Sequence, residues 1–210
     1  VMGKAPLSEC EEMPLWIIPN RKVSLHDVKM AMRDHYEGTA LALDGDMGGG
    51  IWEMPYRPTP LSFKTADGKQ YFNERPVSTQ QSAFTFVAQM RAWLPRQVGG
   101  IIWFGNDDAN MISYVPVYCC TYEVPEAFSN KIAGPTEFSE KSAFWLNNMV
   151  SNYIYPRYSA IMPDLREAQK EMDDFFEADQ KNVEQEVAQM NGDYLAKLQD
   201  MVPALQENAW

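Results

Sequence analysis

Cysteine is scarce in this chain, with only three among 210 residues. Three thiols are too few for a disulfide framework, and Cys10, Cys119 and Cys120 lack the spacing of metal-binding motifs. The adjacent pair lies in an apolar, strand-like run, where successive side chains point to opposite faces and cannot easily bridge. We therefore expect buried structural thiols, with no metal site and no cofactor.

Basic residues and long apolar runs are also few. The 18 Lys and Arg residues face 29 Asp and Glu, for a net charge of −11. This balance argues against nucleic acid or an anionic membrane as a partner, because both need a basic surface. No apolar run reaches the roughly 20 residues that span a bilayer, and no leader is recognisable. The compartment stays open: the cytoplasm or, if a longer parent carries a signal peptide, the periplasm or exterior.

The chain does have enough apolar residues for a core, at 45% hydrophobic and 12% aromatic content. Its acidity is concentrated after Pro163, where 12 acidic residues accompany four basic ones. Helical spacing of apolar residues continues there, from Val183 to Met201. We expect one domain in residues 1–162 and an acidic helical appendage, residues 163–210, packed on it. The alternative is that these helices bind a partner protein.

Two short segments crowd ionisable side chains beside glycine or proline: residues 33–40, RDHYEGTA, and residues 73–79, NERPVST. Such a density of charge is costly inside a fold unless the charges pair or meet a ligand. These segments are therefore the candidate site. Asp pairs at 44 and 46 and at 107 and 108 lack the ligand spacing of a calcium loop and are interpreted as turn residues.

The patterns around these segments predict alternating helices and strands. Ser24 begins a capping box with Asp27, and Gly38 suits the end of the helix that follows. Ser78 is interpreted as the cap of a second helix that Pro95 stops. The remaining expected elements, in chain order, are a Gly- and Pro-rich loop at 39–60, a hairpin of 61–64 with 70–73, strands at 101–104 and 113–120, and a helix at about 142–155.

Several motifs, in this order, resemble the PepD-like cysteine dipeptidases. They are residues 33–39 (RDHYEGT), 73–75 (NER), 78–80 (STQ), 89–95 (QMRAWLP), 99–105 (GGIIWFG), 114–118 (YVPVY) and 142–145 (SAFW). The resemblance implies a member of the N-terminal-nucleophile (Ntn) hydrolases, which share an αββα sandwich. It also implies hydrolysis of dipeptides by a cysteine at the start of the mature enzyme, whose own α-amino group serves as the base.

The chain departs from that family at its first residue. Position 1 is Val, and Cys10 has no free α-amine to act as its base. We therefore interpret the chain as the C-terminal part of a cysteine dipeptidase. It would be inactive alone and completed by the upstream part of the same polypeptide, with a dipeptide as substrate. The fold class expected is α+β: a partial αββα sandwich with an antiparallel sheet, a helical layer and the helical appendage.

Arg75 and Asn73 are the candidates for supporting the missing nucleophile. Arg75 is expected to end a strand before a helix N-terminus, where it would hold a thiolate or bind a substrate carboxylate. Asn73 lies on the same strand face and would donate to an oxyanion. The alternatives are a structural ion pair of Arg75 with Glu74 or with an Asp, and a hairpin-supporting role for Asn73.

Arg33, His35 and Glu37 are the candidates for binding substrate. His35 would orient the substrate or titrate near neutrality, although the dipole of a preceding helix explains a histidine there equally well. Glu37, like Asp34, would bind a substrate amino group or anchor the loop through backbone N–H groups. Arg33 would bind substrate or serve as an ion-pair partner.

Two other functions remain open. One is a non-catalytic Ntn-fold module that binds a protein through its acidic helices. The other is an amidase for another linear or cyclic amide, such as a bile acid conjugate or a penicillin. Because a sandwich that lacks one sheet exposes a large apolar face, a homo-oligomer is also expected of the isolated chain.

Overall fold

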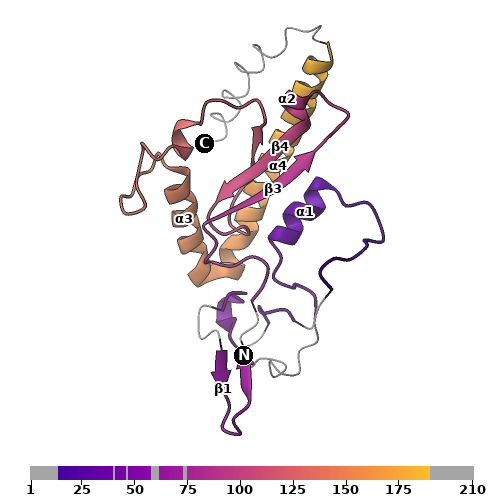
Figure 1. Cartoon of the computed structure of the whole chain (residues 1–210). Helices are drawn as coiled ribbons and strands as arrows, with labels where there is room; N and C mark the ends of the chain where they lie inside the picture. Colours follow the sequence, from indigo (N-terminus) through magenta and orange to yellow (C-terminus); the bar gives the residue numbers. More distant parts are fainter. Residues whose placement is uncertain (1–13, 40, 46, 58–61, 73–74, 190–210) are drawn as a thin grey trace.

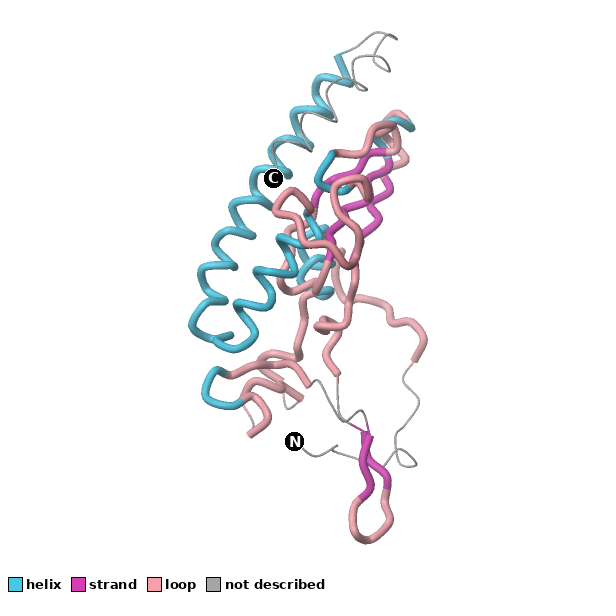
Figure 2. Tube along the Cα trace, turned by 90° about the vertical axis from the view of Figure 1, so that its left-hand side faces the viewer, coloured by secondary structure: helices cyan, strands magenta, loops and turns pink. Residues whose placement is uncertain are grey.

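The structure is a computed structural model that describes residues 14–39, 41–45, 47–57, 62–72 and 75–189. It is an α+β chain in which helices lie against one face of an antiparallel sheet (Figure 1). The hairpin of β1 (Ser62–Lys64) and β2 (Gln70–Phe72) projects away from the rest of the chain in both views (Figures 1 and 2). The predicted hairpin is thus confirmed.

The main sheet has three strands in the order β3-β4-β5, all antiparallel. They are β3 (Phe84–Met90), β4 (Gly100–Asn106) and β5 (Val115–Tyr118). A short helix, α2 (Arg96–Gly99), joins β3 to β4. The two strands expected from the apolar runs at 101–104 and 113–120 are therefore present, but β5 is shorter than predicted. It ends at Tyr118, so the expectation of buried thiols was wrong for Cys119, which is exposed in the following turn, while Cys120 is partly buried.

Two helices cover one face of this sheet, α1 (Leu25–Met32) and α4 (Tyr158–Gln189). From the sheet, Ile101 and Trp103 are almost fully buried on this face. Phe176 and Val183 of α4 enter the same apolar cluster, and the apolar side of α1 packs against it. Burying these large side chains is the main stabilising term of the fold, at about 1.5–3 kcal/mol for each.

The opposite face of the sheet is only half covered. Phe84, Phe86 and Met90 of β3 are 57%, 52% and 70% exposed, and Ile102 of β4 lies beside them at 42%. We call these four side chains the open sheet face. Single exposed apolar residues are ordinary, but a contiguous apolar patch is typical of an interaction surface.

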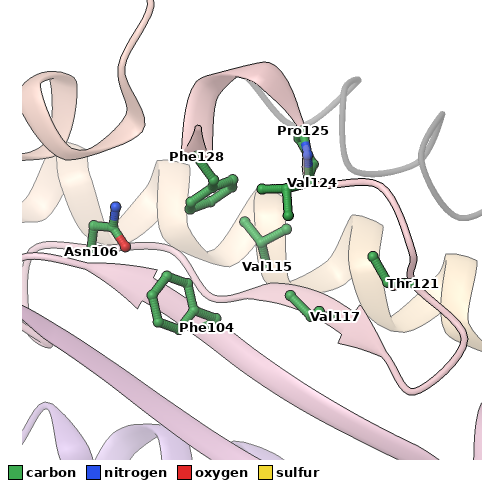
Figure 3. A pocket seen from close by; sticks show the side chains of 8 residues that line it. All are labelled: Phe104, Asn106, Val115, Val117, Thr121, Val124, Pro125 and Phe128. Carbon is green, nitrogen blue, oxygen red and sulfur yellow. The ribbon is translucent and has the colours of Figure 1, made fainter. Parts of the chain in front are cut away.

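Over β5 the same face is closed by a loop. Val124, Pro125 and Phe128, the last in the short helix η3 (Glu126–Phe128), form the cover. Between this loop and Phe104 and Val115 lies an apolar cavity of about 310 Å³ (Figure 3).

The remaining helices form the corner where the chain turns back along the sheet. α3 (Ala143–Ile154) begins after Ser142, as expected, and η4 (Tyr155–Arg157) links it to α4. A second apolar cluster fills this corner, with Tyr56, Ile154 and Met162 as buried members. A further short helix, η2 (Gly50–Trp52), lies in the Gly-rich segment, which has no other regular element among its described residues.

Two helix predictions were wrong. The segment after Ser78 is not a helix: its apolar residues alternate in exposure and form β3, because aromatic and β-branched residues in FTFVAQM fit a pleated surface. Helix α1 ends at Met32, six residues before Gly38, and Arg33 is its C-cap. Gly38 does adopt positive φ, at 74°, but in the loop beyond the helix.

Helix α4 runs without a break across the predicted domain boundary at residues 162 and 163, with Pro163 in its first turns. Val183 and Val187 are buried, as the predicted stripe requires, and belong to the main core cluster. The division into a domain and an appendage stays a prediction, and the part of the appendage after residue 189 lies outside the described residues. No described helix is both long and apolar enough to cross a bilayer.

Candidate functional site

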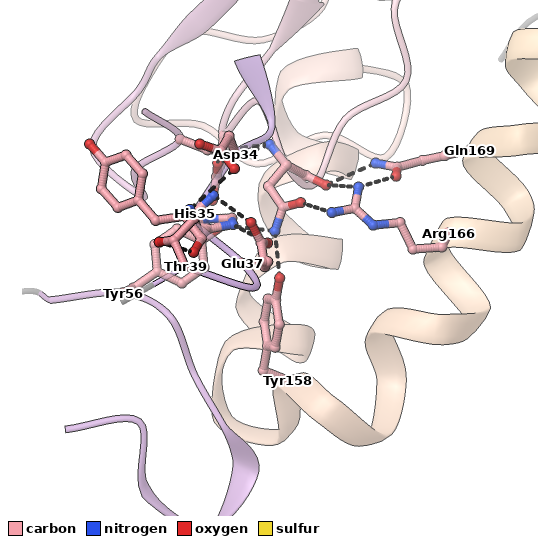
Figure 4. A network of polar contacts seen from close by, with 12 residues as sticks. Asp34, His35, Glu37, Thr39, Tyr56, Tyr158, Arg166 and Gln169 are labelled. Carbon is pink, nitrogen blue, oxygen red and sulfur yellow. Dashed lines mark hydrogen bonds and ion pairs between the residues drawn. The ribbon is translucent and has the colours of Figure 1, made fainter. Parts of the chain in front are cut away.

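Polar side chains gather at the end of the sheet where the chain continues beyond β4. Here the loop after α1, the segment from Arg75 to Gln81 and the turn after β4 meet the start of α4. Figure 4 shows His35 and Glu37 of the loop beside Tyr158 of α4. Three of the polar residues, Ser78, Asp108 and Asn110, are completely buried. Buried polar groups are stable only when they are hydrogen-bonded, so the contacts of this cluster decide its role.

Asp108 is the centre of the first set of bonds. Its Oδ1 accepts a short hydrogen bond from the hydroxyl of Ser78, and its Oδ2 accepts one from Tyr155 at 3.1 Å. The backbone N–H of Asn110 donates to Ser78 Oγ at 2.9 Å and to Asp108 Oδ1 at 3.1 Å. Both functions of the Ser78 hydroxyl are therefore used inside the protein. Ser78 is an anchor between two segments and not the helix cap that was expected.

The side chain of Asn110 connects this set to α4. Its Nδ2 lies 2.9 Å from the hydroxyl of Tyr158 and 3.3 Å from that of Tyr56, and its Oδ1 accepts a short bond from Arg166. Gln169 donates to the Asn110 carbonyl at 2.9 Å. Burial raises the pKa of Tyr158 to about 12 and that of Tyr56 still further, so both phenols stay protonated.

The segment that carries Arg75 is bound to the loop after α1. The hydroxyl of Tyr36 donates to the Arg75 carbonyl at 3.0 Å, and the Ser78 N–H donates to the Asp34 carbonyl at 3.2 Å. The guanidinium of Arg75 donates to Gln81 at 2.6 Å. The two charged segments that the sequence singled out are thus adjacent in space. Asn73 and Glu74 lie outside the described residues.

His35 and Glu37 form a local pair in this loop. The imidazole of His35 is 1% exposed and lies edge-on to Tyr56, with ring centroids 4.8 Å apart. Its Nδ1 is 3.2 Å from Glu37 Oε1, and its backbone N–H donates to Glu37 Oε2 at 2.8 Å. Desolvation favours the protonated carboxyl, but these hydrogen bonds outweigh it and lower the pKa of Glu37 to about 2.

Arg33 points away from this pair, into the space between α1 and α4. Its guanidinium donates to Asp173 at 3.3 Å and to the Ile112 carbonyl at 3.0 Å. Lys29, one turn earlier, also contacts Asp173, at 2.7 Å, and its ammonium lies 4.0 Å above the Trp103 ring. Two buried cations therefore share one carboxylate. These contacts match the ion-pair alternative for Arg33.

Two residues near the cluster have strained backbones. Tyr36 and Asp107 have φ of 64° and 89°, in a region that residues other than glycine rarely adopt. Asp107 is held there by a bond from its N–H to the Ala83 carbonyl and by one from Ser151 Oγ to its Oδ2, at 2.9 and 2.6 Å. Burial raises the pKa of the Asp107 carboxyl. Such strain persists only where the surroundings enforce it, often at functional sites.

Sequence reasoning missed most of the buried cluster. Asp107 and Asp108 were interpreted as ordinary turn residues, and Asn110, Tyr56 and Tyr158 were not singled out at all. The only available signal was the run NDDAN between two apolar segments, which is unusually polar for a chain that returns directly into a sheet. Among the described residues, no group of three or more His, Cys, Asp or Glu side chains could hold a metal ion.

Comparison with known proteins gives a consistent set of matches. The family model described as Peptidase family C69 matches residues 5–171. Dipeptidase A of Lactobacillus helveticus is 26% identical over 141 residues, which cover 67% of this chain and 25% of that protein. Probable dipeptidase B of Streptococcus pyogenes serotype M1 is 22% identical over 161 residues, 72% of this chain and 29% of the relative. The chain thus spans between a quarter and a third of the length of these relatives.

Proposed function

Because the chain belongs to peptidase family C69, we propose that it is the C-terminal portion of a cysteine-type dipeptidase. The nucleophilic cysteine would lie upstream of residue 1 in the same polypeptide. The observation that carries this proposal is the family match over residues 5–171, together with the adjacency of the two charged segments. Relatives named as dipeptidases support the substrate class.

In this proposal the chain supplies one wall of the active site. The upstream thiolate attacks the carbonyl carbon of the dipeptide, and the α-amino group of the same cysteine accepts the thiol proton. That proton passes to the leaving amine as the tetrahedral intermediate collapses to a thioester, which water then hydrolyses. Arg75 provides a positive charge that lowers the pKa of the thiol or binds the substrate carboxylate. Asn73 is proposed as a donor to the oxyanion.

Of the residues proposed to bind substrate, Glu37 keeps the most accessible charged group. Its side chain is 47% exposed, and its lowered pKa keeps it ionised above about pH 2. The Glu37 carboxylate is proposed to bind the ammonium group of the dipeptide. His35 orients this carboxylate through its Nδ1 contact. Arg33 is already bound to Asp173, so its part in substrate binding is to fix the start of this loop.

The open sheet face supports the proposal that the fold is completed by an upstream sheet. Phe84, Phe86 and Met90 are apolar and exposed on a strand with no second neighbour among the described residues. A second sheet packed on this face would bury them and produce the αββα sandwich of Ntn hydrolases. The covering segment is proposed to be the upstream part of the same polypeptide.

The test compares the complete gene product with the 210-residue chain on a panel of dipeptides. We expect the complete product to hydrolyse them, to lose activity on thiol alkylation, and to keep it in a Cys10→Ala variant. The isolated chain should be inactive. Turnover by the isolated chain that Cys10→Ala abolishes would overturn the upstream nucleophile.

Two further outcomes decide between this proposal and its alternatives. Activity on bile acid conjugates or penicillins in place of dipeptides would indicate a different amidase. A complete product with no amidase activity, which captures a partner protein through residues 163–210, would indicate an interaction module.

A further inference from the structure

The segment that carries Arg75 has no regular secondary structure of its own. From Arg75 to Gln81 it consists of bends and turns between β2 and β3. Its position must therefore come from tertiary contacts rather than from a helix or sheet ladder. Two of these contacts are made by the carbonyl of Arg75 and by the residue Ser78.

Ser78 is the inner anchor. Its N–H, its Oγ as donor and its Oγ as acceptor are all bonded, to Asp34, Asp108 and Asn110 respectively. All of its surface is buried, and so is that of Asp108. A charge-assisted hydrogen bond of this kind is roughly twice as strong as a neutral one, and it is directional. Asp108 therefore fixes Ser78 three residues from Arg75.

Tyr36 is the outer anchor. Its φ of 64° is stabilised by two bonds to its carbonyl from Thr39, one from the backbone N–H at 3.1 Å and one from Oγ1 at 2.7 Å. In this strained conformation the hydroxyl of Tyr36 reaches the Arg75 carbonyl at 3.0 Å. The strain is thus located at the residue that contacts the Arg75 segment.

We propose that Asp108, acting through Ser78, and Tyr36, acting through the Arg75 carbonyl, are positioning residues that set the place of the Arg75 guanidinium for dipeptide hydrolysis. The proposal rests on the function proposed above, in which Arg75 meets the thiolate or the substrate. Small displacements matter at such a position, because a shift of about 1 Å in a reacting group can lower the rate about a hundredfold.

The test uses Ser78→Ala in the complete gene product, with Ser151→Ala as the matched control. Ser151 is equally buried and donates to the neighbouring carboxylate of Asp107, so its loss has a similar structural effect without touching the Arg75 segment. We expect kcat/KM for dipeptides to fall about 10- to 100-fold in Ser78→Ala and less than about twofold in Ser151→Ala. Ser78→Thr, which keeps the hydroxyl, should restore most of the activity.

A double-mutant cycle separates positioning from a general structural effect. If Ser78 acts through Arg75, Ser78→Ala should lower kcat/KM by less than about twofold in an Arg75→Ala background. The full 10- to 100-fold loss in that background would overturn the proposal. Tyr36→Phe gives the second variant if Ser78→Ala does not fold, with the same expected dependence on Arg75.

Hydrogen exchange makes the result independent of activity. The amides of residues 75–82 should exchange at least about tenfold faster in Ser78→Ala than in the wild type. Their exchange rates should be unchanged in Ser151→Ala. Unchanged exchange in Ser78→Ala would overturn the positioning proposal even in an active enzyme. If the complete product has no dipeptidase activity but exchange is faster in Ser78→Ala, the role of Ser78 as an anchor is supported and the proposed function is overturned.

Discussion

Replacing Asp173 by Asn should strongly destabilise the chain. Asp173 is the shared partner of two buried cations, with Lys29 fully buried and Arg33 3% exposed. The substitution keeps the shape of the side chain but leaves both positive charges without this carboxylate. Removing one partner of a buried ion pair costs about 3–5 kcal/mol, because the other charge is left desolvated.

The effect can be measured by thermal unfolding of the 210-residue chain, followed by tryptophan fluorescence. The Lys29 ammonium lies 4.0 Å above Trp103, so the probe is next to the change. For a domain of this size about 1 kcal/mol corresponds to roughly 2–4 °C, so the melting temperature should fall by about 6–20 °C. Asp174→Asn is the matched control, since Asp174 forms a solvent-exposed pair with Lys170 and solvent screens such pairs strongly.

The destabilisation should also depend on pH. Burial already lowers the pKa of Lys29, and Asp173 opposes that shift. Without Asp173 the folded-state pKa falls further below the unfolded value, so the unfolded state binds more protons as the pH approaches 10. Stability of the Asp173→Asn variant should therefore rise as the pH rises toward 10.5, the ordinary pKa of a lysine. A loss equal to that of Asp174→Asn, or one that does not change with pH, would refute this reasoning.

Three further predictions concern the loop, the sheet and the open sheet face. The pKa of Glu37 is lowered from 4.5 to about 2, so its stabilising contribution is full above pH 4.5 and is lost as the pH falls through 2. Urea unfolding across this range should show that the stability of Glu37→Gln depends less on pH than that of the wild type. Gly105→Ala should lower the free energy of unfolding by about 1–3 kcal/mol, because the added Cβ would meet the buried side chain of Ile112. Gly45→Ala is the control: it has open space around it and should leave the unfolding midpoint unchanged. The melting temperature of the isolated chain should rise with protein concentration as copies cover the open sheet face, and Phe86→Gln should weaken that dependence; a midpoint independent of concentration would contradict it.

Local signals predicted the elements whose determinants lie within a few residues. The capping box of Ser24 and Asp27 is present with both of its hydrogen bonds, and the hairpin and the strands around Trp103 formed where the alternating patterns placed them. The helix prediction for Phe84–Met90 failed because this short apolar segment fits two patterns. Phe84, Val87 and Met90 are at helical spacing, but in the strand Val87 lies on the face opposite to Phe84, Phe86 and Met90. The long-range partner, β4, decides between these two patterns, and local spacing cannot show it.

The candidate site was predicted only in part, for a related reason. The sequence identified the two charged segments, and the structure joins them through Tyr36 and Arg75. It could not show that Asp108 and Asn110 are buried, because burial depends on α4, which begins some 50 residues later. Likewise, the direction of Arg33 is set by Asp173, 140 residues away.

The pairing of Lys29 with Asp173 has a consequence for the order of events during synthesis. The two residues are separated by 144 positions, so α1 leaves the ribosome long before its carboxylate partner exists. At about 5–20 residues per second, the delay is about 7 to 29 s. During that interval the two cations lack their carboxylate partner, and the apolar face of the sheet lacks the helix that covers it. Helix α4 therefore covers this face of the sheet late in synthesis, and a chaperone that binds the intermediate would act mainly before α4 emerges.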